Sequence, residues 1–372
     1  MSAIEHRKSI DPMSPYVPGK PIDDVKRELG LKEVIKLASN ENPLGTSPKA
    51  KEAAIASFEA TNLYPDGNCT ALRNSLSKRL GVKPERLLFG CGADEIISFI
   101  GKVFVNPGDE CVTAKITFSQ YEASVNAMGG TMVYVPMKNH GFDLDGILEK
   151  ITPKTKAIFL ANPNNPTGTA FTGAEQARFL EKVPEGVLVA IDEAYGEYAD
   201  MEDYPNTLPM LEKYKNVIWI KTFSKIYGLA SLRVGYAVAA EPLISLFEKI
   251  RPPFNVTVQG QAAARAALHD QEFVKKSFES NKASKAYCQK AFAEMGLEWM
   301  PTEANFITVN VGIDTRIAFA ALMKKGYIVR PGHALGMEGW LRVTLGTIHQ
   351  MEGFVKALGE VLEENAIASE NI

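Results

Sequence analysis

The chain has 372 residues, of which 45% are hydrophobic and 23% are charged. This length suggests about two domains, and the apolar share is large enough to bury a core, which excludes a disordered chain. The 41 basic and 44 acidic residues leave a net charge of −3. That balance does not indicate a nucleic-acid binder, whose phosphate-neutralising surface needs a basic excess.

The cysteines, the N-terminus and the apolar runs favour a soluble cytoplasmic protein. The four cysteines are scattered and form no CxxC motif, which indicates free thiols and not disulfides or a zinc site. The five histidines show no metal-ligand spacing, so we expect no metal. The first residues contain no apolar run for a signal peptide. No stretch approaches about 20 uninterrupted apolar residues, so we expect no membrane span.

Short β-rich runs alternate with helical patterns from about residue 86 onward. Near-continuous apolar runs of this kind are typical of strands buried on both faces of a parallel sheet that helices cover. The pattern predicts strands at residues 86–89, 111–114, 132–135, 156–161, 187–191, 217–220 and 234–239. We therefore predict a doubly wound α/β domain with a mostly parallel sheet.

The last third of the chain has a different pattern. Residues 257–295 are strongly helical. Beyond them the sequence predicts strands at 305–309, 327–329 and 341–345 and helices at 316–325 and 350–363. This alternation indicates a smaller α+β domain, on which we expect the first 40 or so residues to pack. We expect a large domain over residues 44–270 and a small domain formed by residues 1–43 and 271–372.

Ligands in open α/β sheets bind at the carboxyl ends of strands, where loops and helix N-termini meet. The first such end is Gly90-Cys91-Gly92-Ala93-Asp94-Glu95. Glycines let the backbone approach an anion, and a first helical turn offers free N–H groups. The run fails as a dinucleotide-binding fingerprint because Glu95 stands at the third glycine position. A plain turn with a helix cap is the alternative.

Two further strand ends carry an amide and a carboxylate. The run NPNNPTG at residues 162–168 favours a rigid turn, but the amide of Asn165 beside a proline could also bind a ligand with little loss of entropy. Asp192 directly follows the buried run 187–191. A carboxylate at this place is costly unless it is paired. Asp192 is therefore either a structural helix cap or the partner of a cationic ligand nitrogen.

The fourth strand end places Lys225 among hydroxyls and cations. Most lysines are solvated surface residues, but Ser224 and Arg233 stand close to this one in the sequence. Burial and a neighbouring cation favour the neutral, nucleophilic form of an amine. The four strand ends together supply an anion cradle, a fixed amide, a buried carboxylate and a reactive amine. Pyridoxal 5′-phosphate (PLP) requires this set of groups.

With these motifs the chain resembles the fold-type I, aspartate-aminotransferase-like PLP enzymes, and within them the histidinol-phosphate aminotransferase family. The likeness runs from PYVPGKP and LASNENPLG through NPNNPTG, DEAY and TFSK…GLASLRVGY to GWLRVTLGT. It implies an enzyme that moves an amino group between L-histidinol phosphate and 2-oxoglutarate in histidine biosynthesis. Ser231 departs from the pattern, because the family usually has a glycine there, and we expect a local adjustment only.

The resemblance also implies how single residues act on the cofactor. Lys225 would bind it covalently and act as the proton shuttle, and Asp192 would keep its ring nitrogen protonated. Asn165 and Tyr195 would hydrogen-bond its 3′-oxygen. Phe118 would stack on its ring, with core packing as the alternative. The phosphate would be held by Arg233, Ser224, Thr222 and the backbone at Gly92, Ala93 and Asp94.

The resemblance further implies a substrate end and a partner subunit. Arg342 matches the arginine that receives a substrate carboxylate or phosphate, and a guanidinium fork suits both. Arg330 and Tyr16 are weaker candidates for the same end, and His333 is a candidate pocket residue. Tyr64 matches a residue that reaches the cofactor phosphate of a partner subunit, which implies a homodimer. Without the resemblance, Tyr64 is an ordinary turn aromatic.

Other functions stay open at this point. An aromatic amino acid aminotransferase would share the same motifs and differ in the lining of its pocket. A threonine-phosphate decarboxylase-like lyase would release carbon dioxide and need no 2-oxoglutarate. A dinucleotide-dependent oxidoreductase is disfavoured by the failed glycine fingerprint, and a purely structural role by the cofactor-directed groups.

Overall fold

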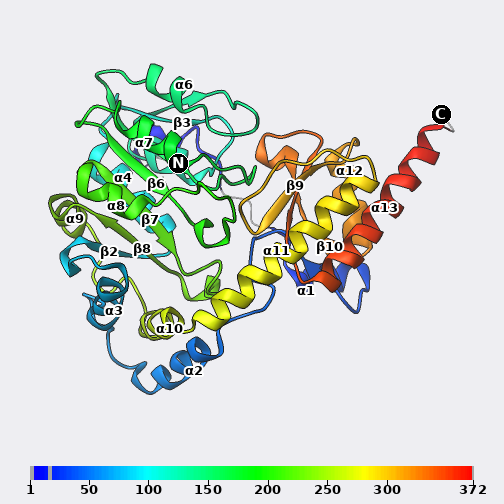
Figure 1. Cartoon of the computed structure of the whole chain (residues 1–372), viewed down its shortest axis with the longest axis horizontal. Coiled ribbons are helices and arrows are strands. Elements are labelled where there is room, and N and C mark those ends of the chain that lie inside the picture. Colours follow the sequence, from blue (N-terminus) through cyan, green and yellow to red (C-terminus); the bar gives the residue numbers. More distant parts are fainter. Residues whose placement is uncertain (1–3, 16–18, 371–372) are drawn as a thin grey trace.

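The computed structural model describes residues 4–15 and 19–370. Its largest element is a seven-stranded sheet with the order β2-β8-β7-β6-β5-β3-β4 (Figure 1). β8 runs antiparallel to both of its neighbours, and the other paired strands are parallel. The strands are β2 (Leu87–Cys91), β3 (Glu110–Ala114), β4 (Thr131–Val135), β5 (Thr155–Ala161), β6 (Leu188–Asp192), β7 (Val217–Thr222) and β8 (Val234–Ala239).

Helices cover both faces of this sheet. Because successive side chains on a strand point to opposite faces, Ile158 and Leu160 of β5 enter one buried apolar cluster and Phe159 enters the other. Helices α4 (Ala93–Phe104), α5 (Gln120–Asn126) and α9 (Glu241–Glu248) contribute to the cluster of Phe159. The opposite face packs on α2 (Pro48–Ala56), α3 (Thr70–Leu80), α6 (Leu144–Glu149), α7 (Gly173–Leu180), α8 (Thr207–Lys213) and α10 (Val258–Leu268). The predicted doubly wound α/β fold is confirmed.

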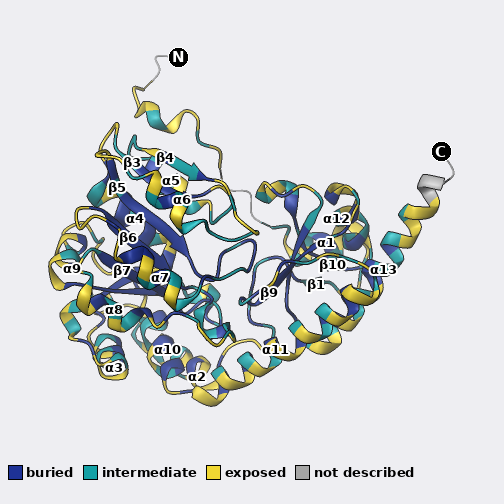
Figure 2. Cartoon of the chain, turned by 45° about the horizontal axis from the view of Figure 1, so that its top comes forward, coloured by how far each residue is buried: buried dark blue, intermediate teal, exposed yellow. Residues whose placement is uncertain are grey.

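A smaller α+β unit lies beside the large sheet. It holds an antiparallel sheet in the order β11-β12-β9 and a parallel pair, β1 with β10. Its strands are β1 (Ile35–Lys36), β9 (Phe306–Asn310), β10 (Tyr327–Ile328), β11 (Arg330–Pro331) and β12 (Trp340–Thr344). Its helices are α1 (Ile22–Leu29), α11 (Gln271–Glu294), α12 (Thr315–Lys324) and α13 (Ile348–Glu370). α11 leads from the large unit into the small one and packs against α13 (Figures 1 and 2).

Figure 2 shows that α11 and α13 each present an exposed face to solvent. Their buried faces pack on the small sheet, where Phe292 and Phe354 meet Leu341 and Val343 of β12. Within the described residues, none of the helices combines the length and the apolar character that crossing a membrane requires.

The N-terminal segment contacts both units. α1 and β1 pack on the small unit, where Val25 meets Ile328 and β1 pairs with β10, as expected. The 3-10 turn at Lys8–Ile10 instead lies against the large unit: Arg7 Nη1 donates to the carbonyl of Ala127, 2.7 Å away, just after α5. Carbonyls at a helix C-terminus attract cations, which explains this contact. The domain boundaries near residues 43 and 270 stay a prediction.

Candidate active site

A cavity of about 1070 Å³ lies at the carboxyl ends of β5, β6 and β7 and is also lined by residues of the small unit. Residues from the two units and from the N-terminal segment line it. Of the predicted site residues, those that line it are Ala93, Asp94, Phe118, Asn165, Asp192, Tyr195, Thr222, Ser224, Lys225, Arg233, Arg330 and Arg342. The fold therefore brings together strand ends that lie far apart in the sequence.

One end of the cavity is a cradle for an anion. Gly92 (φ 78°) joins β2 to α4, and a Cβ atom there would lie 2.4 Å from Nη2 of Arg233. Arg233 Nη1 donates to Ser224 Oγ (3.3 Å), and Nη2 donates to Asp94 Oδ2 (3.0 Å). The first turn of α4 adds N–H groups that have no partners inside the helix. A guanidinium, hydroxyls and a helix N-terminus together suit a phosphate.

Asp192 is the last residue of β6, and its side chain is buried facing the cavity. Burial raises the pKa of this carboxyl to about 6. Two hydrogen bonds act in the opposite direction: Tyr121 Oη donates to Oδ2 (2.7 Å) and the Ala194 N–H donates to Oδ1 (3.1 Å). The Ala194 contact is a local turn and not the helix cap considered above, because the next helical turn, Gly196–Tyr198, begins after Tyr195. It leaves Asp192 on the cavity wall, where a cationic ring nitrogen would stabilise the carboxylate.

Lys225 lies in the loop after β7, half-buried and on the cavity wall. Its Nζ donates to the carbonyl of Ser39 (3.4 Å) and lies 5.4 Å from the centre of the Tyr195 ring. The Tyr195 hydroxyl in turn accepts a hydrogen bond from Asn40 Nδ2 (2.9 Å). The Lys225 amine and the Tyr195 phenol therefore lie in the same region of the cavity. A cofactor that binds the amine covalently could place a ring oxygen near the phenol.

Two arginines form the end of the cavity that belongs to the small unit. Arg330 of β11 lies directly opposite Arg342 of β12 in an antiparallel pair, so both side chains leave the same face of the sheet. Arg342 Nη1 donates to Asn165 Oδ1 (2.6 Å), and Nη2 donates to the carbonyl of Ala38 (2.5 Å). Asn165 therefore links the large sheet to the substrate end of the site.

Two parts of this site are not predicted from the sequence. Tyr121 stands in no motif that marks it, although its hydroxyl binds Asp192 and its ring stacks on Phe159 with centroids 5.0 Å apart. The segment 38–40 belongs to the motif LASNENPLG and is not predicted as part of the site, yet its carbonyls accept from Lys225 and Arg342, and Asn40 donates to Tyr195. The four polar residues that follow Ala38 in that motif are the signal that could have identified it.

Some predicted residues lie elsewhere. Tyr64 is 83% exposed and stacks on Phe254 with ring centroids 4.8 Å apart, away from the cavity of its own chain. His333 Nδ1 hydrogen-bonds Thr315 Oγ1 (3.0 Å) and does not line the cavity. Tyr16 lies outside the described residues. Phe118 lines the cavity and also packs edge-on against Tyr121, so both of its expected roles are compatible with its position.

The groups around the cavity fit PLP. The cradle at Gly92 and Arg233 suits its phosphate, Asp192 suits a protonated ring nitrogen, and Lys225 supplies the amine for its aldehyde. The cradle exists because neither Gly92 nor Gly235 carries a Cβ: at Gly235 that atom would lie 2.5 Å from the Ala93 nitrogen. The chemistry of each group therefore matches one part of the cofactor.

Comparisons with known proteins agree with this geometry. The family model "Aminotransferase class I and II" matches residues 32–358. Histidinol-phosphate aminotransferases of Moorella thermoacetica and Caldicellulosiruptor saccharolyticus are 50% and 48% identical to the chain; each alignment covers 96% of it, and 92% and 99% of those relatives. The structure of the Sinorhizobium meliloti histidinol-phosphate aminotransferase in complex with PLP superposes with a TM-score of 0.88 at 29% identity, covering 98% of this chain and 99% of that one. The chain therefore belongs to the aminotransferase class I and II family and, within it, to the PLP-dependent histidinol-phosphate aminotransferases.

Proposed function

We propose that this chain is a transaminase that moves the amino group of L-histidinol phosphate to 2-oxoglutarate. The observation that carries the substrate assignment is the pair Arg330 and Arg342, which project from one face of β11 and β12 into the cavity that holds Lys225. Two guanidinium groups suit a dianionic phosphate, because each can donate two parallel hydrogen bonds. The relatives, at 42–50% identity over nearly the whole chain, support the same substrate.

Each residue around the cavity has a separate role in this reaction. When bound, PLP stabilises the negative charge left at the substrate Cα. Lys225 Nζ is the base that takes the Cα proton, and Asp192 holds a positive charge on the cofactor ring. Asn165 and Tyr195 would hold the ring oxygen. The cofactor phosphate would be held by Thr222, Ser224, Arg233 and the backbone at Gly92, Ala93 and Asp94, and Phe118 would lie against the ring.

We further propose a homodimer in the cytoplasm. Large apolar side chains gather at the end of α2 and in the loop after it: Ile55, Phe58, Leu63 and Tyr64 are 60%, 60%, 64% and 83% exposed. A group of exposed apolar residues of this kind marks an interaction surface, and a second copy of the chain is the partner that the family supports. Tyr64 would then contact the cofactor phosphate of the partner subunit.

The test is a comparison of amino donors with the purified protein and PLP. The expected result is that one glutamate forms for each L-histidinol phosphate consumed, with no carbon dioxide released. An enzyme that prefers phenylalanine or tyrosine would contradict the substrate and support the aromatic aminotransferase. Release of carbon dioxide without a need for 2-oxoglutarate would support the lyase.

A further inference from the structure

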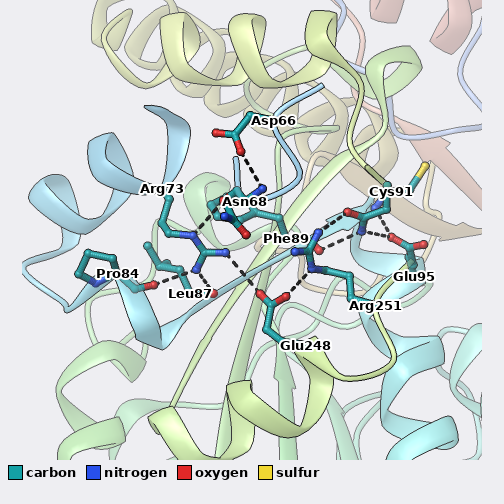
Figure 3. A network of polar contacts seen from close by, with 11 residues as sticks. Asp66, Asn68, Arg73, Pro84, Leu87, Phe89, Cys91, Glu95, Glu248 and Arg251 are labelled. Atoms are coloured by element: carbon teal, nitrogen blue, oxygen red, sulfur yellow. Dashed lines mark hydrogen bonds and ion pairs between the residues drawn. The ribbon is translucent and has the colours of Figure 1, made fainter. Parts of the chain in front are cut away.

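A chain of polar contacts outside the cavity joins the loop at Asn68, four residues after Tyr64, to the turn at Cys91 that leads into the phosphate cradle (Figure 3). At one end, Glu95 of α4 accepts two hydrogen bonds on Oε2, from the Cys91 N–H (2.7 Å) and from Asn255 Nδ2 (2.6 Å). Cys91 directly precedes Gly92. The Glu95 carboxylate therefore fixes the turn from β2 into α4, which forms the cradle.

Asn255 connects this turn to a surface segment. Its Nδ2 also donates to the carbonyl of Phe89 in β2 (3.1 Å), and its Oδ1 accepts from Arg251 Nη1 (2.9 Å). The preceding residue, Phe254, has φ 58°, a conformation that is costly for a bulky side chain and persists only where the surroundings hold it. The hydrogen bonds of Asn255 fix the backbone directly after Phe254. In this conformation the Phe254 ring stacks on the Tyr64 ring.

The contacts continue to the loop that carries Tyr64. Arg251 Nε donates to Glu248 Oε2 (2.6 Å), and Glu248 Oε1 accepts from Arg73 Nη2 (3.3 Å). Arg73 Nε donates to the carbonyl of Asn68 (3.0 Å), four residues after Tyr64. The side chains of Arg73, Glu248 and Arg251 are only 15%, 30% and 10% exposed, and their charges alternate in sign. Such a network is screened weakly by solvent and holds its members in one arrangement.

We propose that Asn255 and Glu95 are positioning residues: they fix the position of the exposed ring pair Tyr64 and Phe254, called here the Tyr64 surface, relative to the phosphate cradle. This inference rests on the proposed function, because it concerns the PLP phosphate and a second subunit. Neither residue lines the cavity. In the dimer, one subunit supplies the cradle and its partner supplies Tyr64, so the phosphate site is complete only when both are correctly placed. The network makes PLP affinity and subunit association depend on the same contacts.

The experiment titrates cofactor-free protein with PLP and measures subunit dissociation by sedimentation, for Asn255→Ala, Glu95→Ala and Glu95→Gln. Loss of hydrogen bonds to a charged group is expected to raise the PLP dissociation constant about tenfold in the two alanine variants. Both should also dissociate at a higher protein concentration than the wild type. Glu95→Gln keeps a carbonyl oxygen for both donors and should recover most of the affinity.

Asn216→Ala is the matched control. Asn216 is half-buried like Asn255, and its Nδ2 also has two acceptors: the backbone carbonyls of Pro184 (3.3 Å) and Val187 (2.8 Å), with no carboxylate among them. It lies at the opposite end of β7 from Lys225. Its loss should lower the melting temperature and leave PLP affinity unchanged.

The proposal is overturned by wild-type PLP affinity in both alanine variants. It is also overturned by an equal loss of affinity in Asn216→Ala, which would indicate general destabilisation. Unchanged subunit dissociation in both alanine variants would also overturn the link to the Tyr64 surface. A wild-type protein that binds no PLP would instead contradict the proposed function, so the two failures are distinguishable.

Discussion

The buried carboxyl of Asp192 gives the cofactor-free protein a stability that depends on pH. Its pKa is about 6 in the folded protein and 3.8 for an ordinary aspartate, and burial is the main cause of the difference. Between these two values the folded state binds a proton that the unfolded state has lost. The stabilisation is therefore complete below pH 3.8 and is lost as the pH rises through about 6.

The size of the effect follows from the shift. A difference of about two pKa units at about 1.4 kcal/mol each corresponds to about 3 kcal/mol of stability lost by pH 7. Asp192→Asn keeps the shape of the side chain and does not titrate. We expect the cofactor-free variant to gain up to about 3 kcal/mol relative to the wild type as the pH rises from 4 to 7. With PLP bound, the gain should disappear, because the carboxylate then faces a cationic ring nitrogen.

Urea denaturation of both cofactor-free proteins at a series of pH values measures this difference. Asp66→Asn is a control: hydrogen bonds with Thr70 lower the pKa of Asp66 from 3.8, so the stability that its ionisation contributes is lost only as the pH falls below that value. The stability difference between that variant and the wild type should stay constant with pH. The reasoning is refuted if the difference caused by Asp192→Asn is equally constant, or if it shrinks as the pH rises.

Three further variants test the site. Lys225→Ala should abolish transamination, because no other amine takes the Cα proton, and wild-type turnover in a glutamate-release assay would contradict this role. Tyr121→Phe removes the O–H that lowers the Asp192 pKa, so the acidic limb of the kcat/KM profile should move to higher pH; an unmoved limb would contradict the contact. Arg342→Ala removes charge-assisted hydrogen bonds and should raise KM for L-histidinol phosphate by at least about tenfold, with a smaller effect on kcat. An unchanged KM in steady-state assays would exclude Arg342 from substrate binding.

The parts of the fold that the sequence predicts are those set by local patterns. Continuous apolar runs such as 187–191 are typical of strands buried on both faces, and the polar residue that ends such a strand lies at the carboxyl edge of the sheet. Asp192 directly follows its run, and Lys225 lies in the loop just after the strand 217–222, so both could be placed at this edge.

The parts that the sequence could not predict depend on packing between distant segments. The contact of Arg342 with Asn165 joins residues 177 positions apart and depends on the register of β12 with β11. Tyr121 lies in a helix beside apolar residues, where a buried tyrosine is indistinguishable from ordinary core until its hydroxyl is placed against Asp192. Arg7 binds the carbonyl of Ala127 from a segment without a regular apolar pattern, so the sequence does not indicate this contact.

The proposed function requires that this cavity binds PLP and that the amino group of L-histidinol phosphate is transferred to it. The most direct measurement is the visible absorption of the PLP-loaded protein before and after L-histidinol phosphate is added without 2-oxoglutarate. We predict a yellow protein that bleaches on this addition and recovers its colour when 2-oxoglutarate follows. A protein that stays yellow with L-histidinol phosphate but bleaches with phenylalanine, or one that PLP cannot colour, would contradict the claim.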